Sequence, residues 1–123
     1  MIREHAWGIC VGESAFSAIY PRYAISGIES VAHSHQIFLQ ILTELGIPGI
    51  TVFLFFLLLL LLYTAGGLQR LHGRPRAELL GCAGALLGAL VMGLFDHLWY
   101  QHGMLCMFIA LSALLCARDW EVA

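Results

Sequence analysis

Charged side chains are scarce in this sequence: Asp, Glu, Lys and Arg together make up 11% of its 123 residues, and the formal net charge is −2. Without a basic patch, the chain is not expected to bind nucleic acid. With 60% hydrophobic residues and a mean hydropathy of +0.84, it is too apolar for a soluble domain of its size. The composition therefore predicts a membrane protein.

Several short motifs are also absent. The four cysteines form no C-x-x-C pair, and three of them lie in apolar runs, so no structural disulfide is expected. No apolar run follows Arg3 and His5, as it would in a cleaved signal peptide. Gly8 and Gly12 belong to no G-x-G-x-x-G or lysine-bearing loop, so tight packing is a better explanation for them than phosphate binding.

The apolar residues form three segments, and the predicted spans cover 47–68, 78–95 and 103–117. The first supplies about 20 uncharged residues, enough at ~1.5 Å per residue for a ~30 Å hydrocarbon core. Gly66 and Gly67 should fray its end, and the loop 69–76 that follows carries three arginines and no acid. The positive-inside rule places that loop in the cytoplasm. Residues 1–46 are then extracytoplasmic, and the predicted fold is an all-α, polytopic membrane protein.

Small residues dominate the second predicted span. The spacing Gly84-x-x-x-Gly88 puts small faces where another helix can approach closely. This helix is therefore expected to pack against more helices than the other two predicted spans provide.

A polar stripe precedes the first span. If the segment is helical at 100° per residue, Glu29, His33, Gln36, Gln40 and Glu44 share one side of it. Such an amphipathic helix beside a membrane entrance is either an interfacial anchor or part of a functional site, and periodicity alone leaves both readings open.

The residues themselves resemble a family at this point. His35-Gln36, followed after nine residues by Gly46-x-x-Gly49, resembles the histidine motif of the O-antigen ligase family of membrane glycosyltransferases. Gly8–Phe16, Tyr20–Tyr23 and Asp96–Tyr100 resemble further parts of the same C-terminal region. Family members are longer and have more spans, so the resemblance implies a C-terminal fragment that lacks the upstream loop arginines.

The resemblance implies transfer of a glycan from undecaprenyl diphosphate to a lipid, saccharide or protein acceptor at the outer face of the plasma membrane. Ligase and polymerase activities are not distinguished by it. No metal or cofactor is implied. The expected partners are the lipid-linked glycan, the acceptor, membrane lipids and the remaining helices of the same enzyme.

The resemblance makes His35 the candidate catalytic residue, because an imidazole can take a proton from the acceptor hydroxyl at neutral pH. The diphosphate leaving group needs charge neutralisation, and Arg22 is the local guanidinium that could provide it. His33 and Glu44 are expected to position substrate. Asp96, at the outer end of a span, either caps a turn or lines the site.

Two rival interpretations remain. His33, His35, His97 and His102 would all lie outside, where they could hold a metal ion. Against this, His33 and His35 point to different faces of a helix, and no cysteine or carboxylate lies at ligand spacing. The alternative function is a small non-enzymatic membrane subunit, or an inactive remnant, that docks on a larger membrane protein.

Overall fold

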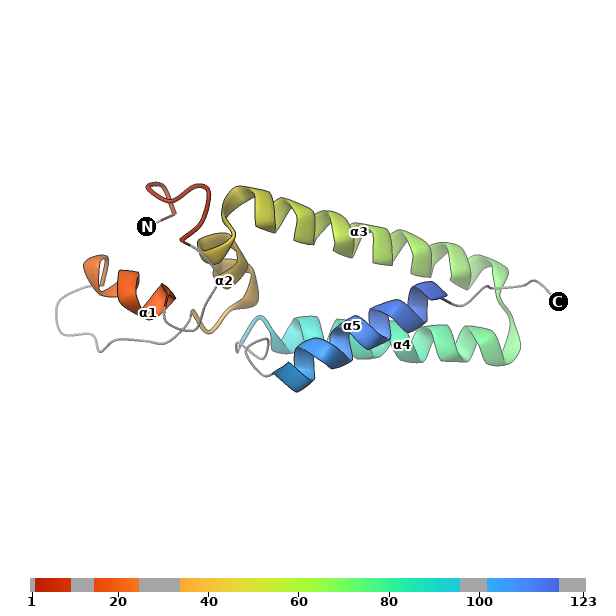
Figure 1. The fold of residues 1–123 in the computed structure, drawn as a ribbon. Helices are drawn as coiled ribbons and strands as arrows, with labels where there is room; N and C mark the ends of the chain where they lie inside the picture. The colour runs from red at the N-terminus through yellow and green to blue at the C-terminus, as the bar shows by residue number, and fades with distance from the viewer. Residues whose placement is uncertain (1, 10–14, 25–33, 96–101, 118–123) are drawn as a thin grey trace.

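The computed structural model describes residues 2–9, 15–24, 34–95 and 102–117, and all regular structure in these ranges is helical (Figure 1). In chain order the elements are α1 (Ala15–Ile19), the 3₁₀ helix η1 (Tyr20–Arg22), α2 (Ile37–Glu44), α3 (Gly46–Arg70), α4 (Gly73–Met92) and α5 (His102–Ala117). The predicted all-α class is confirmed for this part of the chain.

Helices α3 and α4 are long and apolar enough to cross a membrane. They contain 25 and 20 residues, and the most apolar windows have mean hydropathies of 2.4 and 1.3. Only 11% of each window is buried, so most of the apolar surface faces outward. Helix α5 has 16 residues, or ~24 Å, which is shorter than a ~30 Å hydrocarbon core. Two of the three predicted spans thus have the length that a membrane requires.

The connection between α3 and α4 differs from the predicted loop 69–76. It consists only of Leu71 and His72, because α3 continues to Arg70 and α4 begins at Gly73. The glycine pair at 66–67 does not fray α3. Gly73, with φ of +64°, opens α4, and Pro75 fits its first turn because no helical hydrogen bond is required of its nitrogen there.

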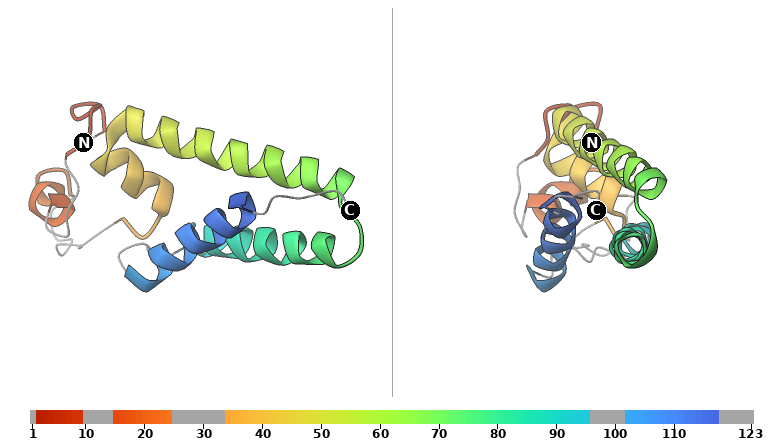
Figure 2. Two further views of the ribbon diagram at one scale, coloured as in Figure 1. Left: turned by 45° about the vertical axis from the view of Figure 1, so that its right-hand side comes forward. Right: turned by 90° about the vertical axis from the view of Figure 1, so that its right-hand side faces the viewer.

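The hydrophobic core extends from this connection to the middle of the long helices. Its buried residues come from α3, α4, α5 and the link itself: Leu60, Leu71, Leu79, Leu86 and Phe108. Gly67 allows α4 to approach, because a Cβ atom there would stand 2.7 Å from a Leu79 methyl carbon. Away from the connection the two long helices diverge, and α2 lies between their far ends (Figures 1 and 2).

Helix α2 is shorter than the predicted polar stripe. It begins at Ile37, and Gln36 has extended backbone angles (φ −154°, ψ 119°), so His35 and Gln36 precede the helix and are not part of its surface. Its buried residues are Ile37, Gln40 and Thr43, whereas Leu39 is 47% exposed. The polar side of the predicted amphipathic helix therefore faces the protein interior.

Candidate functional site

The candidate base His35 lies just before α2 and is exposed. Its two neighbours are held by hydrogen bonds. The Gln36 side chain accepts a bond from the Leu39 amide (2.6 Å) and thereby caps α2, and the Ser34 hydroxyl donates to the Gln36 carbonyl (3.0 Å). An N-cap satisfies one of the free amides that begin every helix, so the start of α2 and the backbone of His35 are fixed together.

A buried amide side chain links this segment to Glu44. Gln40 is 1% exposed; its Oε1 accepts from the Ser34 amide (2.8 Å), and its Nε2 donates to the Glu44 carboxylate (2.7 Å). Both ends of the amide are thus used, as a buried polar group requires. The predicted positioning residue Glu44 is thereby connected to the segment that carries His35.

The N-terminal segment packs against the junction of α2 and α3. The Ile9 amide donates to the Thr43 carbonyl (2.9 Å), and the Ile47 amide donates to the Ala6 carbonyl (2.8 Å). Gly8 and Gly46 both have positive φ, +93° and +68°, and their backbones meet at this point. Tight packing, predicted for Gly8, is confirmed; Gly12 lies outside the described residues.

Arg22 ends η1 and is exposed. The hydroxyl of its neighbour Tyr23 donates a hydrogen bond to the Glu4 carboxylate. The same hydroxyl oxygen lies 3.2 Å from Nε2 of His5. On the other side of Arg22, the rings of Tyr20 and the buried Phe16 stack with centroids 5.1 Å apart. The backbone on either side of Arg22 is therefore anchored.

The Glu4 contact changes the acidity of Tyr23. The hydrogen bond to the carboxylate, desolvation and the negative charge of Glu4 raise the pKa of the phenol above its ordinary value of 10.0, while the positive charge of Arg22 opposes the change. Tyr23 is therefore a neutral hydrogen-bond donor at neutral pH.

Two predicted site residues, His33 and Asp96, lie outside the described residues, as does His97. Within the described part of the chain, no group of three His, Cys, Asp or Glu side chains is close enough to hold a metal ion. Cys82 and Cys106 are free thiols.

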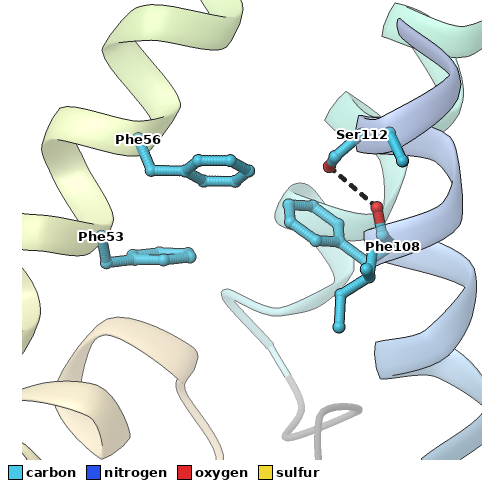
Figure 3. Close-up of a pocket in the computed structure, with 6 residues that line it drawn as sticks. Phe53, Phe56, Phe108 and Ser112 are labelled. Carbon is cyan, nitrogen blue, oxygen red and sulfur yellow. Dashed lines mark hydrogen bonds between the residues drawn. The ribbon is translucent and has the colours of Figure 1, made fainter. Parts of the chain in front are cut away.

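An apolar groove of about 400 Å³ lies between α3 and α5. Phe53 and Phe56 of α3 face Phe108 and Ser112 of α5 across it, with Ile109 and Ala113 completing the lining (Figure 3). The Ser112 hydroxyl donates a hydrogen bond to the Phe108 carbonyl (2.8 Å). Because its proton is used in this bond, the hydroxyl adds little polarity to the groove. A second apolar cavity of about 210 Å³ lies on the other side of Phe108, between α3 and α4.

One residue that lines the groove also contacts α2. Phe53, which lines it, meets Phe38 edge to face with ring centroids 5.8 Å apart. Phe38 lies in the first turn of α2, three residues after His35. The apolar groove between α3 and α5 is thus connected through one aromatic pair to the helix that begins two residues after the exposed His35.

Sequence reasoning did not identify Gln40 or the Glu4–His5–Tyr23 cluster as parts of the site. The four-residue spacing of Gln40 and Glu44 was a visible signal, because such residues are neighbours on a helix. Glu4 and Tyr23 are 19 residues apart, so no local sequence pattern predicts their contact.

Comparison with known proteins gave no match. No family model matches the chain, and no curated protein or solved structure matches it.

Proposed function

We propose that the chain is part of a membrane glycosyltransferase similar to the O-antigen ligases, which transfers a glycan from undecaprenyl diphosphate to an acceptor hydroxyl. One observation carries the proposal: an apolar groove open at its side has one lining residue, Phe53, in ring contact with Phe38, in the first turn of the helix that His35 precedes. A prenyl-diphosphate donor has the same two-part character, since its tail is hydrocarbon and its reacting end is polar.

Each part of the donor has a counterpart. At about 400 Å³ the groove falls in the usual range for ligand sites, about 300–1,000 Å³, and its lining suits an isoprenoid tail. Arg22, anchored on both sides, neutralises the diphosphate, and His35 takes the proton of the acceptor hydroxyl. Attack on the anomeric carbon then inverts its configuration, without a covalent intermediate. The substrates are positioned by Glu44, His33 and Asp96. Further helices of the same enzyme complete the binding site for the isoprenoid tail.

The proposal requires one orientation in the plasma membrane. Helices α3, α4 and α5 are the three spans, with α2 and the N-terminal residues outside and the α3–α4 link in the cytoplasm. Single cysteines in a cysteine-free background test this: His72→Cys should react with an impermeant thiol reagent only from the cytoplasmic side, and Tyr100→Cys only from outside. The reverse pattern would put His35 on the wrong face for the reaction.

Photolabelling tests the groove. A prenyl diphosphate carrying a diazirine on its isoprenoid tail, added to the chain in nanodiscs, should label peptides containing Phe53, Phe56 or Phe108. Replacing Ile109 by Trp should fill the groove and reduce this labelling, whereas Leu80→Trp, at an exposed position of α4, should not. Labelling that is spread evenly over the apolar surface, or unchanged by Ile109→Trp, would argue against a donor site.

One observation favours the second candidate, a non-enzymatic subunit that docks on a larger membrane protein. Gly81, Gly84 and Gly88 of α4 have open space where a Cβ atom would be, as expected of a face that awaits another helix. If docking is the whole function, Gly84→Leu should release a co-purifying membrane partner, and the diazirine probe should label no specific peptide.

A further inference from the structure

Trp7 is the most exposed large apolar side chain in the described part of the chain, at 84%. It lies in the turn that packs on the α2–α3 junction, where Leu45 and Ile47 are also exposed, at 45% and 55%. A soluble surface seldom presents a group of large apolar side chains without an interaction partner. The patch formed by Trp7, Leu45 and Ile47 is therefore expected to have an interaction partner.

The position of Trp7 relative to α3 is fixed by backbone contacts. The residue before it accepts a hydrogen bond from the Ile47 amide (2.8 Å), and the residue after it donates to the His5 carbonyl (2.9 Å). A Cβ atom on Gly46 would overlap the Ala6 carbonyl oxygen, the Trp7 carbonyl carbon and the Gly8 nitrogen. Trp7 is thus held beside the first residue of α3, although it is 39 positions away in the sequence.

If α3 spans the membrane as proposed above, this end of it lies at the membrane surface. The helix has 25 residues, or ~37 Å at ~1.5 Å per residue, which exceeds a ~30 Å hydrocarbon core. Its first turn therefore lies in the headgroup region when its apolar middle is centred in the bilayer. Figure 1 shows the N-terminal segment at this end of the helix, away from the α3–α4 connection.

We propose that Trp7, together with Leu45 and Ile47, is an anchor in the lipid interface of the leaflet where α3 begins. An indole is suited to this place, because its ring lies against the acyl boundary while its N–H bonds to headgroups or water. Ile47 belongs to α3, whose following turns also expose large apolar side chains, among them Val52, Leu54 and Phe55; the lipid that would cover these residues is therefore the expected occupant of the patch. The anchor sets the depth of α2 and of His35 relative to the membrane surface.

This inference rests on the membrane location proposed above, but not on the transferase activity. Fluorescence of the intact chain tests it, with Trp99→Phe and Trp120→Phe leaving Trp7 as the single indole. In nanodiscs of phosphatidylcholine, a nitroxide near the headgroup should quench Trp7 more strongly than one at the chain end. The matched control carries Trp7→Phe and Arg3→Trp, because Arg3 is an exposed charged residue of the same segment; iodide should quench it several-fold more than it quenches Trp7.

The outcomes separate the alternatives. The anchor is overturned if iodide quenches Trp7 and the Arg3→Trp control equally and nitroxide lipid quenches neither. Trp7 would then be available to contact a glycan or a protein. Stronger quenching by the chain-end nitroxide overturns it too, since the indole would lie below the interface. A chain that fails to enter nanodiscs overturns the membrane location itself, which gel filtration detects before any fluorescence is measured.

Discussion

Gly8 and Gly46 lie backbone against backbone: a Cβ atom on Gly46 would stand 2.6 Å from the nitrogen of Gly8, and one on Gly8 would stand 2.8 Å from the nitrogen of Gly46. Neither residue can carry a side chain without moving the other. Gly46, the residue after the C-cap of α2, also has the left-handed conformation that glycine adopts without penalty. One contact therefore sets both the angle between α2 and α3 and the place of the N-terminal segment.

Gly46→Ala should destabilise the fold. The left-handed conformation alone costs an alanine about 1–2 kcal/mol, and the backbone overlap with the N-terminal turn adds to this. Thermal unfolding in detergent micelles measures the change. Gly66→Ala is the matched control in the same helix: a Cβ atom there meets nothing within 4 Å, and alanine should stabilise a helix interior by roughly 0.5–1 kcal/mol. If the two variants unfold at the same temperature, the contact does not determine the fold.

The long helices could be read from the sequence, whereas this contact could not. The uncharged run after Gly46 predicts α3, because few structures other than a membrane helix accommodate so many consecutive apolar residues. The pairing of Gly8 with Gly46 is non-local, and a glycine signals only that a side chain is not tolerated. The predicted periodicity is wrong at the start of α2 for a related reason: Gln36 and Gln40 have helical spacing, but the Gln36 side chain caps the N-terminus of α2, so the helix begins only at Ile37.

The boundary errors also have local causes. The sequence predicts a loop over 69–76, but Gly73 turns the chain at once, and Arg74 and Arg76 lie in the first turn of α4. The ion pair of Arg74 with Glu78 (3.0 Å) supports that first turn, in the manner of other pairs four residues apart. The motif resemblance makes His35 a candidate, whereas the contact of Gln40 with the Ser34 amide depends on how the fold directs that amide and has no local sequence signal.

Gln40→Leu should loosen the segment that carries His35. The Ser34 amide loses its acceptor and the Glu44 carboxylate loses a donor. Both groups are half-buried, so the cost should not exceed the about 1–3 kcal/mol of an unsatisfied group that is fully buried. Hydrogen exchange should show faster exchange of the Ser34 amide. Gln69→Leu makes the same substitution at an exposed position of α3 and should leave that amide unchanged. Equal protection in both variants would mean that Gln40 does not hold the segment.

The Tyr23 contact should be sensitive to high pH. The neutral phenol donates to Glu4, and the pKa of Tyr23 is raised in the folded protein. The contact therefore contributes fully below the ordinary value of 10.0 and is lost as the pH rises through the raised pKa. Tyrosinate absorbance, compared between the wild-type chain and Tyr23→Phe, isolates this titration.

Two further variants check the cause. Glu4→Gln should move the pKa of Tyr23 down towards its ordinary value, because both the charge and the best acceptor are removed. Glu78→Gln, which alters a carboxylate on α4 paired with Arg74, should leave it in place. A Tyr23 titration that does not respond to Glu4→Gln would assign the raised pKa to another source.

His35→Ala, measured in the complete enzyme to which the chain is proposed to belong, should lower the rate by on the order of 10²–10⁴ if His35 is the general base. Donor binding should change little, since proton removal stabilises the transition state and not the ground state. Arg22→Ala should do the reverse and weaken donor binding first. His35→Gln is the sharper variant, because it keeps a polar group of similar reach that cannot take a proton at neutral pH. More than about a tenth of the activity remaining in His35→Gln would be too much for the loss of a base, and His35 would then position substrate without accepting its proton.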